Sequence, residues 1–172
     1  MKLEIGAGEY PDKDFDIHAD VLPLDDIEVL CRLDLLPFKD GTFAGLRASH
    51  VLEHQSWELV DPTLREWGRV LRPGAEVFIG VPDAWFLARQ WVQGELTTLE
   101  ANYWMLGGHT DRDAHKGVDD RGVPRWFWNA HHTFFNAEWL HEMVEATGLF
   151  DDIEVTCYDE RSLRCLCRRA QA

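Results

Sequence analysis

The chain has 172 residues, of which 45% are hydrophobic and 28% charged, which is the length and balance of one ordinary globular domain. Its formal net charge is −14, and because such a surface repels phosphate backbones, we expect no nucleic-acid partner. No apolar run approaches the roughly 20 residues of a membrane helix, and the start MKLEIGAG reads as a strand rather than a secretory signal. We therefore expect a cytoplasmic protein without membrane contact.

Short apolar runs alternate with helical patterns along the chain, which is typical of an α/β sheet. Strands are predicted at 3–5, 15–19, 27–33, 43–48 and 75–81, with a closing antiparallel pair at 153–158 and 163–167. Helices are predicted within 51–71, with Asp61 as N-cap and Pro62 as first residue of its main part, and twice between 84 and 106 around Gly94. A last helix is capped by Asn136, runs to Ala146 and is terminated by Gly148.

The connection between the first two strands is short. Residues 8–15 offer fewer than the roughly dozen residues that a crossover between parallel neighbours normally requires. The first crossover helix is therefore expected to be reduced or absent. We predict a single domain over residues 1–172, with a Rossmann-like, mostly parallel sheet, helices on both faces and a C-terminal antiparallel hairpin.

Two glycines and one carboxylate follow the first two predicted strands. Gly6 and Gly8 come directly after a buried strand, where a missing side chain lets the backbone pass close to a ligand. Asp20 ends the next strand, where a carboxylate can accept two hydrogen bonds from a ribose diol, and Asp16 is the alternative if the register differs. Sheets of this kind bind ligands at the carboxyl ends of their strands.

The order of several further motifs is more specific than any one of them. After LEIGAG and the acid at position 20 come LDLLPFKDGTF, ASHVLEH, LREWGRVLRPGAEVFIGVPD and, later, HHTFFNAEWLHEMVEATGLF. In this order the chain resembles the class I S-adenosylmethionine-dependent methyltransferase superfamily, in particular its methyltransferase type 11-like branch. The resemblance runs from Leu3 to about Asp83 and resumes near the C-terminus.

The resemblance implies a set of cofactor-binding residues. The methionine half of S-adenosylmethionine would be surrounded by Glu4, Gly6, Ala7 and Gly8, and the ribose hydroxyls would bind Asp20. The adenine would lie against Asp34 and Leu35. The floor of the site near the methyl group would be formed by Ser49 and His50. The acid that the family usually carries before the LPF leucine is here Arg32. Adenine recognition then comes from the backbone or from Asp34.

Histidines and tryptophans gather in the second half of the chain. The imidazoles of His109, His115, His131 and His132, with Asp111 and Asp113, could suit a metal, but their spacing matches no helix-borne motif, so we expect no metal ligands. If a general base is used, His132 or His109 is expected first and His54 next. The segment 84–133 is expected to be an insertion forming a lid over the acceptor pocket, with aromatic walls from Trp85, Trp91, Trp104, Trp126 and Trp128 that suit a planar or cationic molecule.

Three functions are weighed. The first is methyl transfer from S-adenosylmethionine to a small molecule. The second is a cofactor-binding domain without catalysis that serves a partner protein, and the third is a metal-dependent hydrolase using the histidine cluster. The acceptor, the methylated atom and the oligomeric state do not follow from the sequence.

Overall fold

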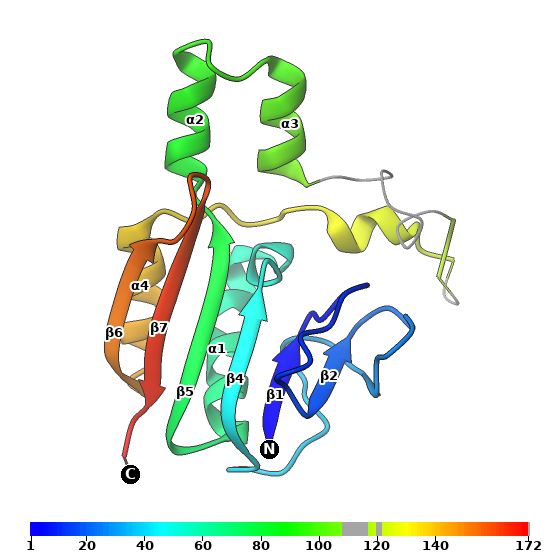
Figure 1. Ribbon diagram of the computed structural model, residues 1–172, viewed down its shortest axis with the longest axis vertical. Helices are drawn as coiled ribbons and strands as arrows, with labels where there is room; N and C mark the ends of the chain where they lie inside the picture. Colours follow the sequence, from blue (N-terminus) through cyan, green and yellow to red (C-terminus); the bar gives the residue numbers. More distant parts are fainter. Residues whose placement is uncertain (108–116, 120–121, 172) are drawn as a thin grey trace.

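The computed structural model describes residues 1–107, 117–119 and 122–171, and it contains a seven-stranded sheet in the order β3-β2-β1-β4-β5-β7-β6 (Figure 1). The strands are β1 (Lys2–Ile5), β2 (Ile17–Asp20), β3 (Val29–Leu30), β4 (Phe43–Ser49), β5 (Leu71–Pro82), β6 (Phe150–Cys157) and β7 (Ser162–Arg169). Neighbours from β3 to β5 pair in parallel, whereas β7 runs antiparallel to both β5 and β6. This confirms the predicted mostly parallel sheet with its C-terminal hairpin.

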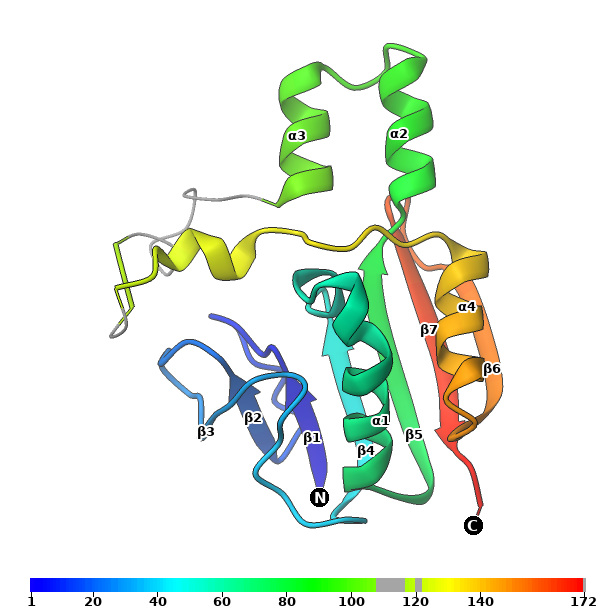
Figure 2. The same ribbon diagram turned by 180° about the vertical axis from the view of Figure 1, so that it is seen from behind.

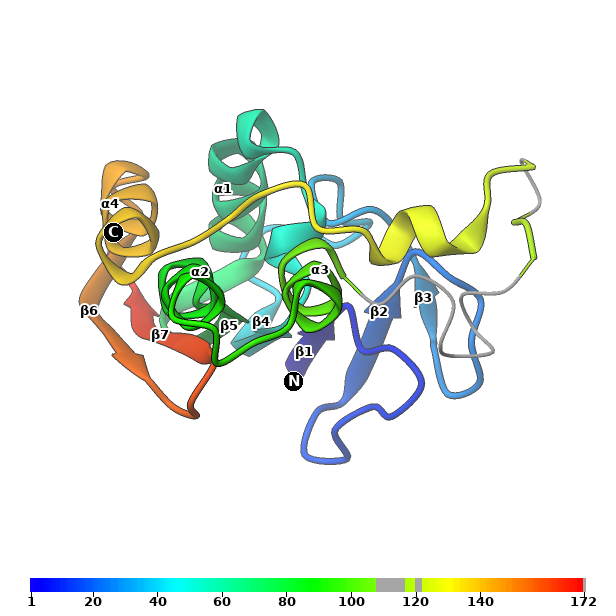
Figure 3. The same ribbon diagram turned by 90° about the horizontal axis from the view of Figure 1, so that it is seen from above.

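The helices occupy two places relative to the sheet. They are α1 (Val60–Val70), α2 (Ala84–Val92), α3 (Thr98–Leu106) and α4 (Ala137–Ala146), with the 3-10 turns η1 (Leu52–His54), η2 (Trp57–Leu59) and η4 (Arg125–Asn129). Figures 2 and 3 show α1 and α4 on the same face of the sheet, while α2 and α3 stand side by side beyond the carboxyl end of β5. Residues 6–16 contain no helix, as the short spacing predicts.

The hydrophobic core lies between the strands and the helices α1 and α4. Alternate residues of the strands, such as Ile5, Leu46 and Ile79, are at most 2% exposed and pack with Trp67 of α1. The indole Nε1 of Trp67 donates to the carbonyl of Leu33 at 3.0 Å, so its one polar atom is also satisfied. This packing between the sheet and the helices holds the carboxyl ends of the strands at one edge of the sheet.

The other face of β1, β2 and β4 carries polar side chains. Glu4 pairs in register with His18 on one side and Arg47 on the other, so these three residues form one row across the strands. Helices were expected on both faces, but α1 and α4 both cover the apolar one. The reason is the brevity of the 6–16 connection, because no crossover helix follows β1 and the 6–16 loop itself packs against this row, where the Asp12 amide donates to Glu4.

Two local expectations are corrected. The helix α1 begins at Val60, with Leu59 as its N-cap and no side-chain cap, because the turn η2 already winds the chain before Asp61. Asp61 instead accepts a hydrogen bond from Arg65 one turn later, at 2.9 Å. The strand expected at 27–33 is paired only over β3, and a turn follows in which the Leu35 amide donates to the Arg32 carbonyl at 3.3 Å.

Helix boundaries in the second half agree with the prediction. The side chain of Asn136 accepts from the Trp139 amide at 2.8 Å and caps α4, and Gly148 with φ 65° follows its end. The break between α2 and α3 contains Gly94. Within the described part of the chain, no helix has both the length and the apolar character that crossing a bilayer requires.

Candidate cofactor and acceptor site

A cavity of about 760 Å³ opens at the carboxyl ends of the parallel strands. Residues that follow β1, β2 and β4 line one part of it, and residues of α3 and of the segment 127–132 line another. Small-molecule and cofactor sites typically have volumes of this order. The edge is also the one where open α/β sheets bind their ligands.

The glycine turn after β1 forms a tight backbone passage. Gly6 has φ 64°, its amide donates to the Ala19 carbonyl at 2.8 Å, and a Cβ added at Gly6 would lie only 2.2 Å from Cγ2 of Val51. The Ala7 amide reaches the same carbonyl at 3.3 Å. Gly8 also has φ 64°, but open space surrounds the position of its missing Cβ. Gly6 is therefore demanded by packing, whereas Gly8 leaves room for a ligand beside the backbone.

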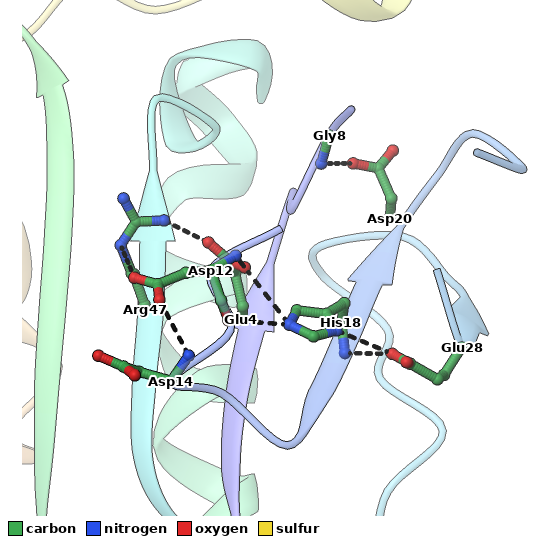
Figure 4. A network of polar contacts seen from close by, with 8 residues as sticks. All are labelled: Glu4, Gly8, Asp12, Asp14, His18, Asp20, Glu28 and Arg47. Carbon is green, nitrogen blue, oxygen red and sulfur yellow. Dashed lines mark hydrogen bonds and ion pairs between the residues drawn. The ribbon is translucent and has the colours of Figure 1, made fainter. Parts of the chain in front are cut away.

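The Asp20 carboxylate lies directly against this turn. Its Oδ2 accepts from the Gly8 amide at 3.0 Å (Figure 4). Its Oδ1 accepts from the Leu22 amide at 2.9 Å. Asp20 is 8% exposed and lines the cavity. Each carboxylate oxygen has a second lone pair, so both can still accept from a ligand. The alternative acid, Asp16, accepts from the Lys2 amide at the opposite end of the strands and does not line the cavity.

Glu4 has a different environment from the one expected. Its carboxylate is buried among protein groups, with the Arg47 guanidinium against Oε1 and the Asp12 amide donating to Oε2 at 2.7 Å (Figure 4). The residue lines the cavity, but its charge is paired with Arg47 and holds the 6–16 loop to the strands. Sequence reasoning missed Arg47, whose signal is a charged residue in an otherwise apolar strand.

His18 extends this network toward β3. Its Nε2 lies 3.0 Å from the Asp12 carbonyl and its Nδ1 lies 3.1 Å from the Glu28 carboxylate (Figure 4). Burial works to lower the pKa of His18, but the Asp12 carbonyl and the Glu28 and Glu4 carboxylates outweigh it, so the pKa is raised. A doubly protonated ring can donate to both acceptors and thus fixes the loop below the glycine turn.

The segment expected against adenine is only partly in place. Asp34 lines the cavity and accepts a two-pronged ion pair from Arg32 at 2.9 and 2.7 Å, which lowers the pKa of Asp34. Leu35 does not line the cavity, and it is 69% exposed because the turn at Arg32 directs it outward. Leu22 and Leu33 line the cavity instead, which sequence reasoning missed.

Ser49 and His50 lie at the end of β4, where both line the cavity as expected. His50 has φ 53°, a left-handed conformation that is uncommon for a residue with a side chain. Its Nε2 lies 3.3 Å from the Tyr158 hydroxyl and 3.4 Å from Ser162 Oγ. Burial works to lower the pKa of His50, but the adjacent Glu53 carboxylate outweighs it, so the pKa is raised.

The three predicted base candidates have different positions. His54 lines the cavity, with Nδ1 3.1 Å from the Ala130 carbonyl and Nε2 3.2 Å from the His50 carbonyl. His132 also lines the cavity, and its ring lies 5.3 Å from that of Phe127, centroid to centroid. His109 lies outside the described residues, as do His115, Asp111 and Asp113 of the predicted cluster.

Aromatic side chains form the outer wall of the cavity, but they are not all the ones expected. Trp104 and Trp128 line it, together with Tyr103 and Phe127. Trp85 and Trp91 do not, and they are 71% and 45% exposed; the side chain of Trp126 lies outside what the structure describes. The Arg161 guanidinium lies 4.8 Å from the Trp104 ring centre and lines the same wall, so a cation already occupies part of it.

Comparisons with known proteins address the family. Residues 9–79 match the family described as "Methyltransferase domain". The search of curated protein sequences gives no match.

Solved structures match the chain over nearly its whole length. A Thermotoga maritima protein described as a S-adenosylmethionine-dependent methyltransferase, possible histamine N-methyltransferase, has 17% identity over 99% of this chain and 81% of its own, with a TM-score of 0.63. The chain has the class I methyltransferase fold. The predicted resemblance to these enzymes and their type 11-like branch is thereby confirmed.

Two further structures with the methyltransferase fold were solved with different bound partners, one with small molecules and the other with a protein. The Burkholderia thailandensis 1,6-didemethyltoxoflavin-N1-methyltransferase, solved with that compound and S-adenosylhomocysteine, has 14% identity over 99% of this chain and 71% of its own, with a TM-score of 0.62. A Haloferax volcanii putative methyltransferase, solved with the activator Trm112, has 13% identity over 99% and 82%, with a TM-score of 0.56. These findings support the expected cofactor, S-adenosylmethionine.

Proposed function

We propose that the protein transfers a methyl group from S-adenosylmethionine to a small-molecule acceptor. The observation that carries the proposal is the contact between the glycine turn and the carboxylate that ends β2. Gly8 and Asp20 come from different strands and meet at one edge of a cavity large enough for a cofactor and a second molecule.

The residues present suit each part of the cofactor. Asp20 offers free lone pairs to the ribose hydroxyls, and the open space at Gly8 suits a chain running along the backbone of residues 6–8. The adenine lies against Asp34 and Leu33, and Leu33 replaces the expected Leu35. Ser49 and His50 form the floor below the methyl group, and Glu4 acts by holding the 6–16 loop.

The acceptor is assigned to the part of the cavity under the insertion. In this proposal residues 84–133 form a lid on a single domain of residues 1–172, and Tyr103, Trp104 and Phe127 provide its aromatic lining. The sulfonium of the cofactor supplies an already activated methyl group. The protein then contributes position and a pocket from which water is excluded, as in-line displacement requires.

A proton acceptor is needed when the nucleophile is a hydroxyl or a protonated amine. Among the candidates in the described part of the chain, His132 has the exposed ring at the cavity wall, while both ring nitrogens of His54 already face carbonyl oxygens. We therefore keep His132 ahead of His54 in this role. The assignment of His109 stays a prediction.

One observation favours the second candidate, a cofactor-binding domain that serves a partner protein. Among the described residues no helix lies over the polar face of β1, β2 and β4 (Figure 3), so this side of the 6–16 loop is accessible to another protein. The Haloferax volcanii neighbour was solved with an activator protein. In either case we place the protein in the cytoplasm and assign it no nucleic-acid partner.

Turnover distinguishes the two candidates. Purified protein is incubated with S-adenosylmethionine and a panel of amines, phenols, thiols and carboxylic acids, and S-adenosylhomocysteine is quantified. The proposal predicts acceptor-dependent product that falls at least tenfold in Asp20→Asn. Cofactor binding without product for any acceptor supports the second candidate and contradicts methyl transfer.

A further inference from the structure

The carboxylate of Glu53 is buried and lacks a hydrogen-bond partner. The side chain is 1% exposed, and neither oxygen has a partner among the described residues. The nearest ring nitrogens around Oε1 are His50 Nδ1 at 3.6 Å and His131 Nε2 at 3.9 Å, both beyond hydrogen-bond length. A buried carboxylate that has histidines nearby but no hydrogen bond is disfavoured, so this group requires an explanation.

Two imidazoles beside Glu53 are oriented by backbone carbonyls. His131 Nδ1 lies 3.2 Å from the Met105 carbonyl, which fixes the proton on Nδ1 and leaves the Nε2 lone pair directed toward Glu53. His54 Nδ1 has the same kind of partner, the Ala130 carbonyl at 3.1 Å, and its Nε2 lies 3.2 Å from the His50 carbonyl, a contact that a bound ion would replace. Histidines that bind metals usually donate their other ring N–H to a carbonyl or a carboxylate in this way.

The donor atoms are separated as ligands of one ion are. One atom from each of Glu53, His54 and His131 lies within 4.8 Å of the other two. Metal–ligand bonds of about 2.0–2.2 Å place neighbouring ligands roughly 3–4 Å apart, so the 3.9 Å between His131 Nε2 and Glu53 Oε1 already suits a shared ion.

We propose that Glu53, His54 and His131 bind a divalent transition-metal ion such as Zn²⁺ at the inner wall of the cavity. Two imidazoles and one carboxylate suit Zn²⁺, Co²⁺ and related ions rather than Mg²⁺ or Ca²⁺, which prefer oxygen ligands. The site differs from the cluster weighed in the sequence, because only His131 is common to both. It also departs from the expectation that the chain carries no metal ligands.

The ion would join two segments that are distant in sequence. Glu53 and His54 belong to η1, whereas His131 belongs to the segment that returns from the insertion, and the His132 amide already donates to the Glu53 carbonyl at 2.8 Å. All three donors line the cavity. A three-donor set leaves a coordination position open, and this position would be available to an acceptor oxygen; that last step rests on the proposed function.

Metal binding is tested on untagged full-length protein that has been stripped with a chelator and dialysed. Zn²⁺ is titrated by calorimetry and Co²⁺ by its visible absorbance, with thermal unfolding measured before and after Zn²⁺ addition. The variants are Glu53→Gln, His54→Asn and, as the control, His141→Asn, which changes a 41% exposed histidine of α4 outside the cluster. Circular dichroism verifies that each variant is folded.

The proposal predicts about one equivalent of Zn²⁺ in the wild type and in His141→Asn, with a higher melting temperature when Zn²⁺ is bound. Binding should weaken roughly tenfold or more in Glu53→Gln and in His54→Asn. Absence of stoichiometric binding, or equal affinity in all four proteins, overturns it. S-adenosylmethionine calorimetry on the same samples is independent, so failure of the metal site and failure of the cofactor site give different results.

Discussion

The Gly8 amide donates a 3.0 Å hydrogen bond to the carboxylate of Asp20, although the two residues lie on different strand ends. The bond closes the glycine turn onto the end of β2, so the backbone and the acid form one surface of the cavity. The Asp20 carboxylate therefore has two roles. It faces the ligand, and it also holds the glycine turn along which the ligand lies. Changes on either side of this contact are therefore expected to affect both folding and binding.

The glycine turn yields the first prediction. Gly6→Ala places a Cβ 2.2 Å from Val51 Cγ2 at φ 64°, so it should lower the free energy of unfolding by roughly 2–4 kcal/mol through strain and overpacking. Gly8→Ala has the same φ but meets no atom, so it should cost only about 1 kcal/mol. Chemical denaturation measures both. Equal losses would show that Val51 does not constrain the turn.

The second prediction concerns the buried charge of Glu4. Arg47→Ala removes the guanidinium that pairs with this carboxylate and should destabilise the protein by roughly 3 kcal/mol, because a buried charge loses its partner. The matched control is Arg168→Ala, whose pair with Glu76 is exposed on both sides and should contribute less than about 1 kcal/mol. Urea unfolding of the two variants checks the difference. A similar small loss in both would mean that the Asp12 amide and His18 satisfy Glu4 without Arg47.

The third prediction is that the free energy of unfolding depends on pH through the ion pair between Glu66 and Arg69. The Arg69 guanidinium hydrogen-bonds Glu66, which also accepts from the Leu36 amide at 2.8 Å, and the pKa of Glu66 is lowered. A lowered folded-state pKa means that the stabilisation is complete above the ordinary pKa of a glutamate and is lost as pH falls through the folded value. Stability should therefore decline below about pH 4.5.

Glu66→Gln should remove that part of the acid dependence and cost roughly 1–2 kcal/mol at neutral pH. The exposed Glu58, in η2, provides the control Glu58→Gln, which should leave the profile unchanged. Thermal unfolding between pH 3 and 7 is the measurement. If the melting temperatures of Glu66→Gln and the wild type fall equally as the pH is lowered, Glu66 is not the group responsible.

The fourth prediction concerns thiol reactivity beside the ribose acid. Burial, with the nearby Asp20 charge, raises the pKa of Cys31 to about 11, so its thiol should remain protonated and react slowly with iodoacetamide at pH 8. Cys157 is exposed and should be modified first. Peptide mass spectrometry over a time course measures both. Modification of Cys31 as fast as Cys157 would contradict the burial of this strand end.

The sequence predicted the elements that depend on local pattern. The alternation of apolar residues located β1, β4 and β5, and the caps located α4, because these signals are contained within a few neighbouring residues. The proximity of Asp20 to Gly8 followed from the shared edge formed by the carboxyl ends of parallel strands, together with the family resemblance. The short spacing before β2 also revealed the missing crossover helix.

The features of the site that the sequence did not predict depend on contacts between segments that are distant along the chain. The resemblance places Glu4 at the cofactor, whereas its carboxylate pairs with Arg47, 43 residues away in the sequence, a contact that no local pattern reveals. Leu35, which the resemblance places against the adenine, is directed outward by the turn at Arg32, and this turn has no strong sequence signal. Glu53 belongs to the ASHVLEH motif, but its lack of hydrogen-bond partners emerges only when η1 and the segment around His131 are brought together.

Calorimetric titration with S-adenosylmethionine tests the central claim most directly, using the wild type, Asp20→Asn and the control Asp16→Asn at the opposite strand end. The account predicts one cofactor per chain, a loss of roughly 1.5–3 kcal/mol in Asp20→Asn, which is about 10- to 150-fold in affinity, and no change in Asp16→Asn. Wild-type affinity in a folded Asp20→Asn protein would contradict it.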